Sequence, residues 1–356
     1  MPLCSIQGRD FRRFRRFELV CDPHMNWLVG PNGSGKPSIL EGIYLLARGK
    51  SFRTTRIQVL QRQGSAGFAI KARVTDPLRG YTHLAAAGGA GGIRYTIQGE
   101  AVRNMSMLAE LCPVQLMDPR LTPLVAGSPR DRRRFLDWGL FHVEPSFHAH
   151  WRDYSRALEQ RNGALRIGAS DDVLSGWEGL LAREGEVISA LRNALLADIS
   201  STLYQRAVDL GGPDETALRY LSGSPAGQSL EDALRRSRAR DRHLGITSIG
   251  PHRADLDIRI GGQPAHQVLS RGEEKRLTYA LLLAQVDVFH RRTGGFPVLL
   301  LDDPVAELDQ RSWQRLMSIL ESLPAQQFVT ALDDGIPQGK SISLFHVEQL
   351  DTMGVV

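Results

Sequence analysis

The spacing of apolar residues divides the first hundred positions into strand-like and helix-like stretches. Residues 1–20 alternate apolar and basic positions and predict one or two strands, and residues 25–29 form a short apolar run that predicts a strand ending at Gly30. Apolar residues from Ile39 to Ala47 recur at helical spacing, and Gly49 is placed to end that helix. Residues 68–102 alternate again around a glycine-rich turn, which predicts an antiparallel meander.

From residue 129 to 208 the apolar pattern is helical, with a period close to 3.6 residues. The strand-like pattern resumes near Ile246, and the apolar runs at 298–301 and 327–331 predict two more strands. We therefore expect one domain whose two halves, residues 1–120 and 244–356, are separated by an inserted helical domain at 121–243.

Residues 30–38 form a glycine loop between a predicted strand and a predicted helix. They match the P-loop pattern G-x-x-x-x-G-K-[ST] at the first glycine, the last glycine and the lysine. Glycine lets backbone N–H groups approach phosphate oxygens closely, because it has no Cβ. A turn that binds nothing is the alternative. We predict a nucleotide site, with Lys36 reaching the β- and γ-phosphates, formed by Gly30, Pro31, Asn32, Gly33, Ser34, Gly35, Lys36, Pro37 and Ser38.

Pro37 departs from the P-loop pattern, which requires Ser or Thr at this position. Proline supplies neither the hydroxyl that would bind Mg²⁺ nor a backbone N–H for a phosphate. It is tolerated in the first turn of a helix, so the fold is not threatened. Ser38 follows, but its side chain should point in a different direction around the helix. We expect weakened binding of ATP with Mg²⁺.

The run V-L-L-L-D-D-P at 298–304 is an apolar strand that ends in two carboxylates. This is the Walker B arrangement, in which a buried strand delivers acids to the Mg²⁺ ion and the attacking water. We expect Asp302 to hold the Mg²⁺ and Asp303 to orient or deprotonate the water. An acidic turn at a strand end is the alternative.

Two further motifs flank the acidic strand. Residues 269–276, L-S-R-G-E-E-K-R, resemble the ABC signature, in which Ser270 and Gly272 at a helix N-terminus would contact the γ-phosphate bound to a second subunit. Residues 306–309, A-E-L-D, resemble the D-loop and place Asp309 at the same interface. Because such contacts act between subunits, the motifs imply an ATP-dependent homodimer. An ordinary helix cap is the alternative for the signature-like segment alone.

The net charge of +5 is modest, so the position of the arginines is more informative than their number. Arginine clusters neutralise phosphates without reading sequence. Salt bridges with nearby acids are the alternative, and Phe11, Phe14 and Phe17 between the first arginines are better explained as core residues. The candidate DNA contacts are Arg130, Arg132, Arg133, Arg240 and Arg242.

Composition excludes several classes of protein. The three cysteines lie far apart with no C-x-x-C spacing, so neither a disulfide framework nor a zinc site is predicted. No apolar run has membrane-spanning length, and no apolar segment of a signal peptide follows the early arginines. We therefore expect a cytoplasmic protein without a membrane partner.

Taken in order, these motifs resemble the RecF family. The resemblance also rests on S-F-R-T at 51–54, on G-S-P-R-D-R-R-R-F-L-D at 127–137 and on G-P-H-R-A-D-L at 250–256, and it extends to about residue 310. Pro37, Gly42 and Ala254 depart from the family pattern. The resemblance implies an α/β fold, an ABC-type P-loop ATPase head like that of SMC proteins. A mixed sheet with an antiparallel lobe, plus the inserted helical domain, is expected.

The resemblance also implies a function. RecF proteins bind ATP and DNA, dimerise with ATP and act with RecO and RecR type proteins to load the recombinase at single-stranded gaps, in replication restart and in the SOS response. Single-stranded, gapped and duplex DNA, ATP and Mg²⁺ are the expected ligands. Two alternatives remain, a nucleotide-binding scaffold without turnover because of Pro37, and a transporter ATPase subunit, which the wide separation of Lys36 from Asp302 argues against.

Overall fold

The computed structural model describes residues 3–76, 80–213, 215–332 and 343–350, and the contacts within it define two compact units. The first unit combines residues 1–122 with residues 293–356, and the second spans residues 123–292. The expected boundary after residue 120 lies close to the observed one. We expected residues 244–292 to belong to the same domain as residues 1–120, but they group with the second unit.

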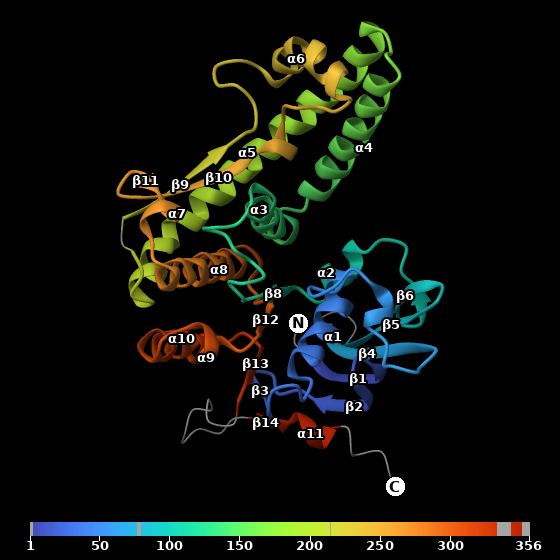
Figure 1. The fold of residues 1–356 in the computed structure, drawn as a ribbon, viewed down its shortest axis with the longest axis vertical. Coiled ribbons are helices and arrows are strands. Elements are labelled where there is room, and N and C mark those ends of the chain that lie inside the picture. Colours follow the sequence, from blue (N-terminus) through green and yellow to red (C-terminus); the bar gives the residue numbers. More distant parts are fainter. Residues whose placement is uncertain (1–2, 77–79, 214, 333–342, 351–356) are drawn as a thin grey trace. The chain divides into compact units, whose positions relative to one another are not determined.

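One sheet of the first unit is antiparallel, with the strand order β2-β1-β4-β5-β6-β7 (Figure 1). Phe11, Phe14 and Phe17 are buried in its core, as expected. Their burial excludes a role as exposed stacking platforms for bases. The strands are β1 (Leu3–Phe11), β2 (Phe14–Val20), β4 (Gly67–Asp76), β5 (Gly80–Gly89), β6 (Gly92–Ile97) and β7 (Glu100–Ala101).

A second sheet of the first unit is parallel and has the order β14-β3-β13-β12-β8. The sequence predicted its three central strands because they are continuous apolar runs, which is typical of strands buried on both faces. It missed the two short edge strands. The strands are β3 (Met25–Val29), β8 (Val114–Leu116), β12 (Val298–Leu301), β13 (Gln327–Ala331) and β14 (Ser343–His346).

Helix α1 (Lys36–Arg48) contacts strands of both sheets, namely β1, β4 and β5 of the antiparallel sheet and β8 and β13 of the parallel one. The helix ends at Gly49, whose φ of 64° is the left-handed conformation that glycine favours. Gly42 faces Ile70, and a Cβ at Gly42 would lie 3.2 Å from its Cδ1, so close packing explains this glycine. The other helices of this unit are η1 (Ile57–Val59), α2 (Ser106–Leu111), α9 (Pro304–Glu307), α10 (Gln310–Ser322) and α11 (Val347–Leu350).

The second unit is mainly helical, and α4 lies beside α5 along much of its length (Figure 1). Its sheet has the order β11-β10-β9, and β10 pairs with β9, which joins residues 255–260 to residues 216–221. This pairing explains why residues after 244 belong to this unit. The elements are α3 (Pro129–Val143), α4 (Phe147–Arg166), α5 (Asp171–Asp209), β9 (Thr216–Leu221), α6 (Leu230–Leu244), η2 (Pro251–Arg253), β10 (Asp255–Ile260), β11 (Gln263–Pro264), α7 (Ala265–Val268) and α8 (Arg271–Thr293).

The structure agrees with the predicted α/β class and refines the expected mixed sheet. The parallel and antiparallel strands of the first unit form separate sheets that α1 contacts from between them. Within the described ranges, none of the helices combines the length and the apolar character that crossing a membrane requires.

Candidate nucleotide site

The glycine loop connects β3 to α1, as the sequence predicted. Gly30, Gly33 and Gly35 have φ angles of 142°, 83° and 104°, which are unfavourable for residues with a Cβ. A Cβ at Gly35 would also lie only 2.5 Å from Cζ of Phe14. The loop therefore needs glycine at Gly35 both for its conformation and for its packing on β2.

Three polar side chains of the loop are buried, those of Ser34, Lys36 and Ser38. Nζ of Lys36 donates hydrogen bonds to the backbone oxygens of Gly30 and Pro31, the latter at 3.1 Å. The hydroxyl of Ser34 is buried and has no hydrogen-bond partner among the described residues. Buried polar atoms are normally satisfied, so this orphaned hydroxyl fits a loop that receives phosphate oxygens.

Pro37 occupies the first turn of α1, whose N-cap is Gly35. The backbone N–H of Ser38 donates to the oxygen of Gly35 at 2.8 Å, so this N–H is already used by the helix. The side chain of Ser38 lines the same cavity as the glycine loop. Proline is thus compatible with the fold, while the hydroxyl of the P-loop pattern is missing from position 37.

The acidic pair lies directly after β12, whose four residues are all buried. Oδ1 of Asp302 accepts a hydrogen bond from the hydroxyl of Thr330 at 2.9 Å, and that hydroxyl accepts from the N–H of Asp303 at 2.8 Å. Burial raises the pKa of the Asp302 carboxyl above its ordinary value. Asp303 has a φ of 49°, a strained conformation for a residue with a side chain, which is frequent at functional turns.

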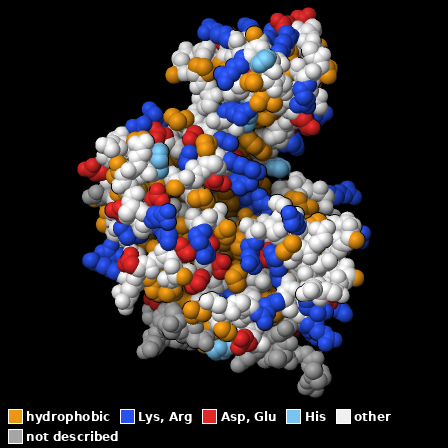
Figure 2. Space-filling model, in the orientation of Figure 1, with side chains coloured by type: hydrophobic (Ala, Val, Ile, Leu, Met, Phe, Trp, Pro, Cys, Tyr) orange, Lys and Arg blue, Asp and Glu red, His pale blue; other side chains and the backbone are white. Residues whose placement is uncertain are grey.

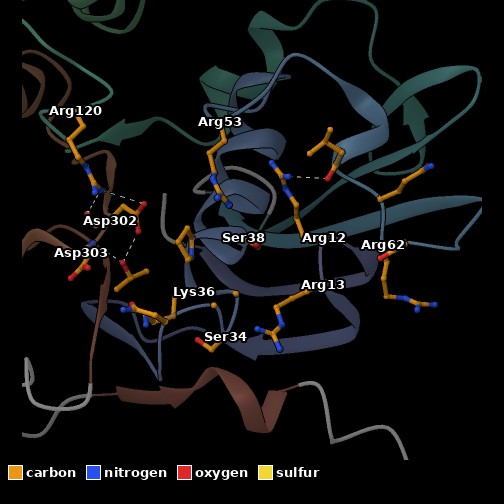
Figure 3. A pocket seen from close by; sticks show the side chains of 18 residues that line it. Arg12, Arg13, Ser34, Lys36, Ser38, Arg53, Arg62, Arg120, Asp302 and Asp303 are labelled. Atoms are coloured by element: carbon orange, nitrogen blue, oxygen red, sulfur yellow. Dashed lines mark hydrogen bonds and ion pairs between the residues drawn. The ribbon is translucent and has the colours of Figure 1, made fainter. Parts of the chain in front are cut away.

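One cavity of the first unit, of about 910 Å³, brings these two motifs together (Figure 3). Its lining includes the loop residues from Asn32 to Ser38 and both Asp302 and Asp303. Gly30 and Pro31 are not among the lining residues, and they contribute the carbonyls that hold Lys36. The lining residues that sequence reasoning did not assign to the site are Arg12, Arg13, Arg53, Val59, Gln61, Arg62, Gln63, Arg120 and Thr330.

Arg12 and Arg53 line the cavity, and both contact the same buried carboxylate, that of Glu41. The guanidinium of Arg12 contacts both oxygens of Glu41, with Nε donating at 2.6 Å, and Nη1 of Arg53 lies 3.9 Å from Oε2 of the same glutamate. Glu41 is fully buried on α1. The arginines had a signal in the F-R-R-F and S-F-R-T segments, but nothing in the sequence connected them with Glu41.

The signature-like and D-loop-like residues both lie at helix N-termini. Ser270 precedes α8 and exchanges hydrogen bonds with Glu273, whose Oε2 accepts from the serine hydroxyl at 2.6 Å and from its backbone N–H at 2.9 Å. Asp309 caps α10 by accepting from the N–H of Ser312 at 3.0 Å. Ser270, Gly272 and Asp309 are exposed.

Comparison with known proteins identifies the family. The family model described as the RecF/RecN/SMC N terminal domain matches residues 2–350. The DNA replication and repair protein RecF of Thioalkalivibrio sulfidiphilus is 38% identical over 98% of both chains, and that of Stenotrophomonas maltophilia is 37% identical over the full length of both. The chain belongs to the RecF family.

Solved structures support the same fold. A RecF structure described as the recombination mediator protein with ATP in the RecFOR pathway has a TM-score of 0.86 and 23% identity, and the match covers 97% of this chain and 96% of that one. An Smc head bound to the C-winged helix domain of ScpA has a TM-score of 0.55 over 94% of this chain and 90% of that one, at 17% identity. The RecF fold therefore includes an ABC-type head shared with SMC proteins.

Three of the arginines proposed for DNA form contacts within this RecF family chain. Arg132 donates to both carboxylate oxygens of Asp255, at 2.7 and 2.9 Å. Arg133 donates to the backbone oxygen of Ala254, and Arg242 to the carboxylate of Asp171, at 2.6 and 2.7 Å. The contacts of Arg132 and Arg242 agree with the alternative of internal salt bridges, and Arg133 is bound to a backbone oxygen instead. All three arginines therefore have structural contacts that a role in DNA binding would have to accommodate.

Arg130 and Arg240 remain exposed candidates for phosphate contacts, at the start of α3 and near the end of α6. On the face shown in Figure 2, Lys and Arg side chains are spread over the surface and do not form one continuous stripe. A continuous basic patch, which is the usual footprint of a nucleic-acid interface, is therefore not visible on this face.

His252 of the G-P-H-R segment is held by two neutral groups. Its Nε2 lies 2.9 Å from the backbone oxygen of Thr247 and must carry the proton, because a carbonyl only accepts. Its Nδ1 then accepts from the hydroxyl of Tyr154 at 2.6 Å. Burial is the main cause that lowers the pKa of His252 to about 4; the nearby Arg253 and Arg133 act in the same direction, and the hydrogen bond to Thr247 and the charge of Asp241 oppose them. The G-P-H-R segment thus has a structural role, because its neutral His252 forms hydrogen bonds with Thr247 and Tyr154.

We expect this histidine to make the protein less stable in acid. The unfolded chain binds a proton near the ordinary pKa of 6.5, while the folded chain does so only near 4, so the free energy of unfolding should fall as the pH falls between these values. Urea denaturation at several pH values should show a weaker dependence for His252→Gln than for the parent chain. His243→Gln, an exposed control, should leave the dependence unchanged. Identical curves for His252→Gln and the parent would contradict the assignment.

Proposed function

We propose that the chain is a RecF-type protein that binds ATP and DNA in recombinational gap repair, replication restart and SOS induction. It would bind single-stranded or gapped DNA and duplex DNA in the cytoplasm, and act with RecO and RecR type mediator proteins to help load the recombinase. The names of its relatives, which describe DNA replication and repair, support this role. The solved relative with ATP supports the choice of nucleotide.

The single observation that carries the proposal is the cavity in which the glycine loop meets the Walker B acids. Lys36, the orphaned hydroxyl of Ser34 and several arginines line this cavity, so its chemistry suits a polyphosphate. Asp303, the candidate to orient a water, lies on its wall. A nucleoside triphosphate is the ligand that fits both features, since its phosphates match the basic loop and its terminal phosphate would lie near the acids.

We also propose that ATP brings two copies of the chain together. Ser270 and Gly272 of one subunit would face the γ-phosphate bound by the other, and Asp309 would lie at the same interface. Their exposure at capped helix N-termini supports this role, because such termini carry N–H groups and a positive dipole that suit an anion.

Pro37 supports a second candidate function, that of a scaffold that binds nucleotide and DNA without turnover. The scaffold and the hydrolysing clamp differ at this one position, since Pro37 lacks the hydroxyl ligand of the P-loop pattern.

We expect Pro37→Thr to raise the rate of ATP hydrolysis by about tenfold or more, because threonine restores a hydroxyl for Mg²⁺ where the transferred phosphate is bound. Steady-state hydrolysis by the parent and the variant, with and without gapped DNA, measures this effect. Little turnover by the parent and DNA-stimulated turnover by the variant would favour the scaffold. Turnover by both, accelerated by DNA, would favour the clamp. Rates of ATP hydrolysis that do not change with DNA in either protein would contradict the proposed function.

We expect the double variant Arg130→Gln, Arg240→Gln to bind DNA more weakly and with a smaller dependence on salt. Each lost phosphate contact should reduce the slope of log K against log salt concentration by about 0.7 to 0.9. Fluorescence anisotropy with labelled gapped DNA at several salt concentrations measures this slope. Arg94→Gln, an exposed control on β6, should not change it. An unchanged slope in the double variant would place the DNA contacts elsewhere.

A further inference from the structure

The guanidinium of Arg120 lies beside Asp302 at the Walker B end of the cavity (Figure 3). Its Nε and Nη2 each donate to Asp118 at 3.0 Å, and its Nη1 lies 3.2 Å from Oε1 of Glu307. Nη2 also donates to the backbone oxygen of Asp302 at 3.1 Å and lies 3.8 Å from Oδ2 of its side chain. One cation therefore contacts the Walker B acid and two further acidic residues.

These carboxylates are largely buried, so they depend on Arg120 to balance their negative charge. The side chains of Asp118, Asp302 and Glu307 are 1%, 14% and 12% exposed, while that of Arg120 is 45% exposed. Negative charges with so little access to water require a nearby cation. In this chain a side chain supplies that cation.

The oxygen atoms around this position fit Mg²⁺ poorly. Mg²⁺ requires near-octahedral oxygen ligands. Pro37 contributes no hydroxyl, and both oxygens of Asp118 are engaged by Arg120. Oδ1 of Asp302 already accepts from Thr330, while its Oδ2 faces Arg120. A metal ion here would have to displace the guanidinium from its carboxylate partners.

We propose that Arg120 replaces the divalent cation at this end of the cavity, so that the chain binds a nucleoside triphosphate without Mg²⁺. Lys36 and Arg53 line the same cavity and would share the phosphate charge with Arg120. A guanidinium presents a planar set of donors that matches phosphate oxygens, which makes arginine suited to this task. The inference rests on the proposed binding of ATP and adds the side chain that neutralises the charge of its phosphates.

The test is a titration of the full chain with a fluorescent ATP analogue, in excess Mg²⁺ and in excess EDTA. We expect the two dissociation constants of the parent chain to agree within about twofold, since the counter-charge belongs to the protein. Arg120→Gln should weaken binding in EDTA by about tenfold or more, and Mg²⁺ should recover part of the loss. Arg120→Lys, which keeps the charge, should bind better in EDTA than Arg120→Gln. Arg94→Gln should match the parent.

The outcomes separate this inference from the proposed function. If EDTA abolishes binding by the parent while Mg²⁺ supports it, the inference is wrong and the proposed binding of ATP stands. If the parent binds the analogue in neither condition, the proposed function fails. If Arg120→Gln, with a thermal unfolding midpoint like that of the parent, binds in EDTA as the parent does, another residue neutralises the phosphates.

Discussion

Replacing Lys36 by alanine should reduce the affinity for ATP by about 30-fold or more, because truncating one partner of a buried, hydrogen-bonded charge pair costs about 2–5 kcal/mol. The ammonium is almost fully buried beneath the loop, with the carbonyls of Gly30 and Pro31 as its partners, so it is already positioned for phosphate oxygens. Equilibrium binding of a fluorescent ATP analogue measures the change.

Lys71→Ala is a matched control for this variant. Lys71 is exposed on β4 and does not line the cavity, so its removal should leave the affinity for ATP unchanged. A thermal unfolding midpoint like that of the parent would show that Lys36→Ala is folded. A folded Lys36→Ala variant with the affinity of the parent would exclude the glycine loop as the phosphate site.

Arg161→Met should lower the free energy of unfolding by about 3–5 kcal/mol, because it leaves the buried carboxylate of Asp241 without its cationic partner and leaves Glu178 with Arg238 alone. The guanidinium of Arg161 on α4 is fully buried and donates to Glu178 on α5 at 2.9 Å and to Asp241 on α6 at 2.8 Å. It also donates to the hydroxyl of Thr247 at 2.9 Å. A single side chain thus joins three helices of the second unit.

Urea denaturation measures this loss, and Arg235→Met supplies the comparison. Arg235 lies on α6 and pairs with Glu231 at 3.1 Å, and both side chains are at least half exposed. Such exposed pairs contribute about 0–1 kcal/mol, so this variant should resemble the parent. An equal effect of both variants would show that burial does not determine the importance of the Arg161 network.

The parts of the fold that the sequence predicted well are those with a strong local signal. The strand β3, the glycine loop and the start of α1 follow directly from an apolar run, three glycines and a helical period. The edge strand β14 has alternating exposure and only four residues, so it offered no comparable signal. The pairing of β9 with β10, which moves residues after 244 into the second unit, depends on contacts between segments far apart in the sequence.

The candidate site shows the same limit. The motifs around Lys36 and Asp302 identified both walls of the cavity, because the chemistry requires particular residues at fixed spacing. Arg120 belongs to no motif, and its role becomes visible only where β8 and β12 lie side by side and bring Asp118 close to Asp302. Conversely, Arg132 looked like a DNA contact in the sequence, yet it pairs with Asp255 on β10.

The measurement that tests the account most directly is the affinity of the chain for gapped DNA with and without ATP, combined with its mass in solution by sedimentation. The account predicts that ATP converts the chain to a dimer and tightens DNA binding by about tenfold or more, a coupling of about 1.4 kcal/mol. Lys36→Ala should lose both effects. A chain that binds gapped DNA equally well as a monomer, with or without ATP, would contradict the account.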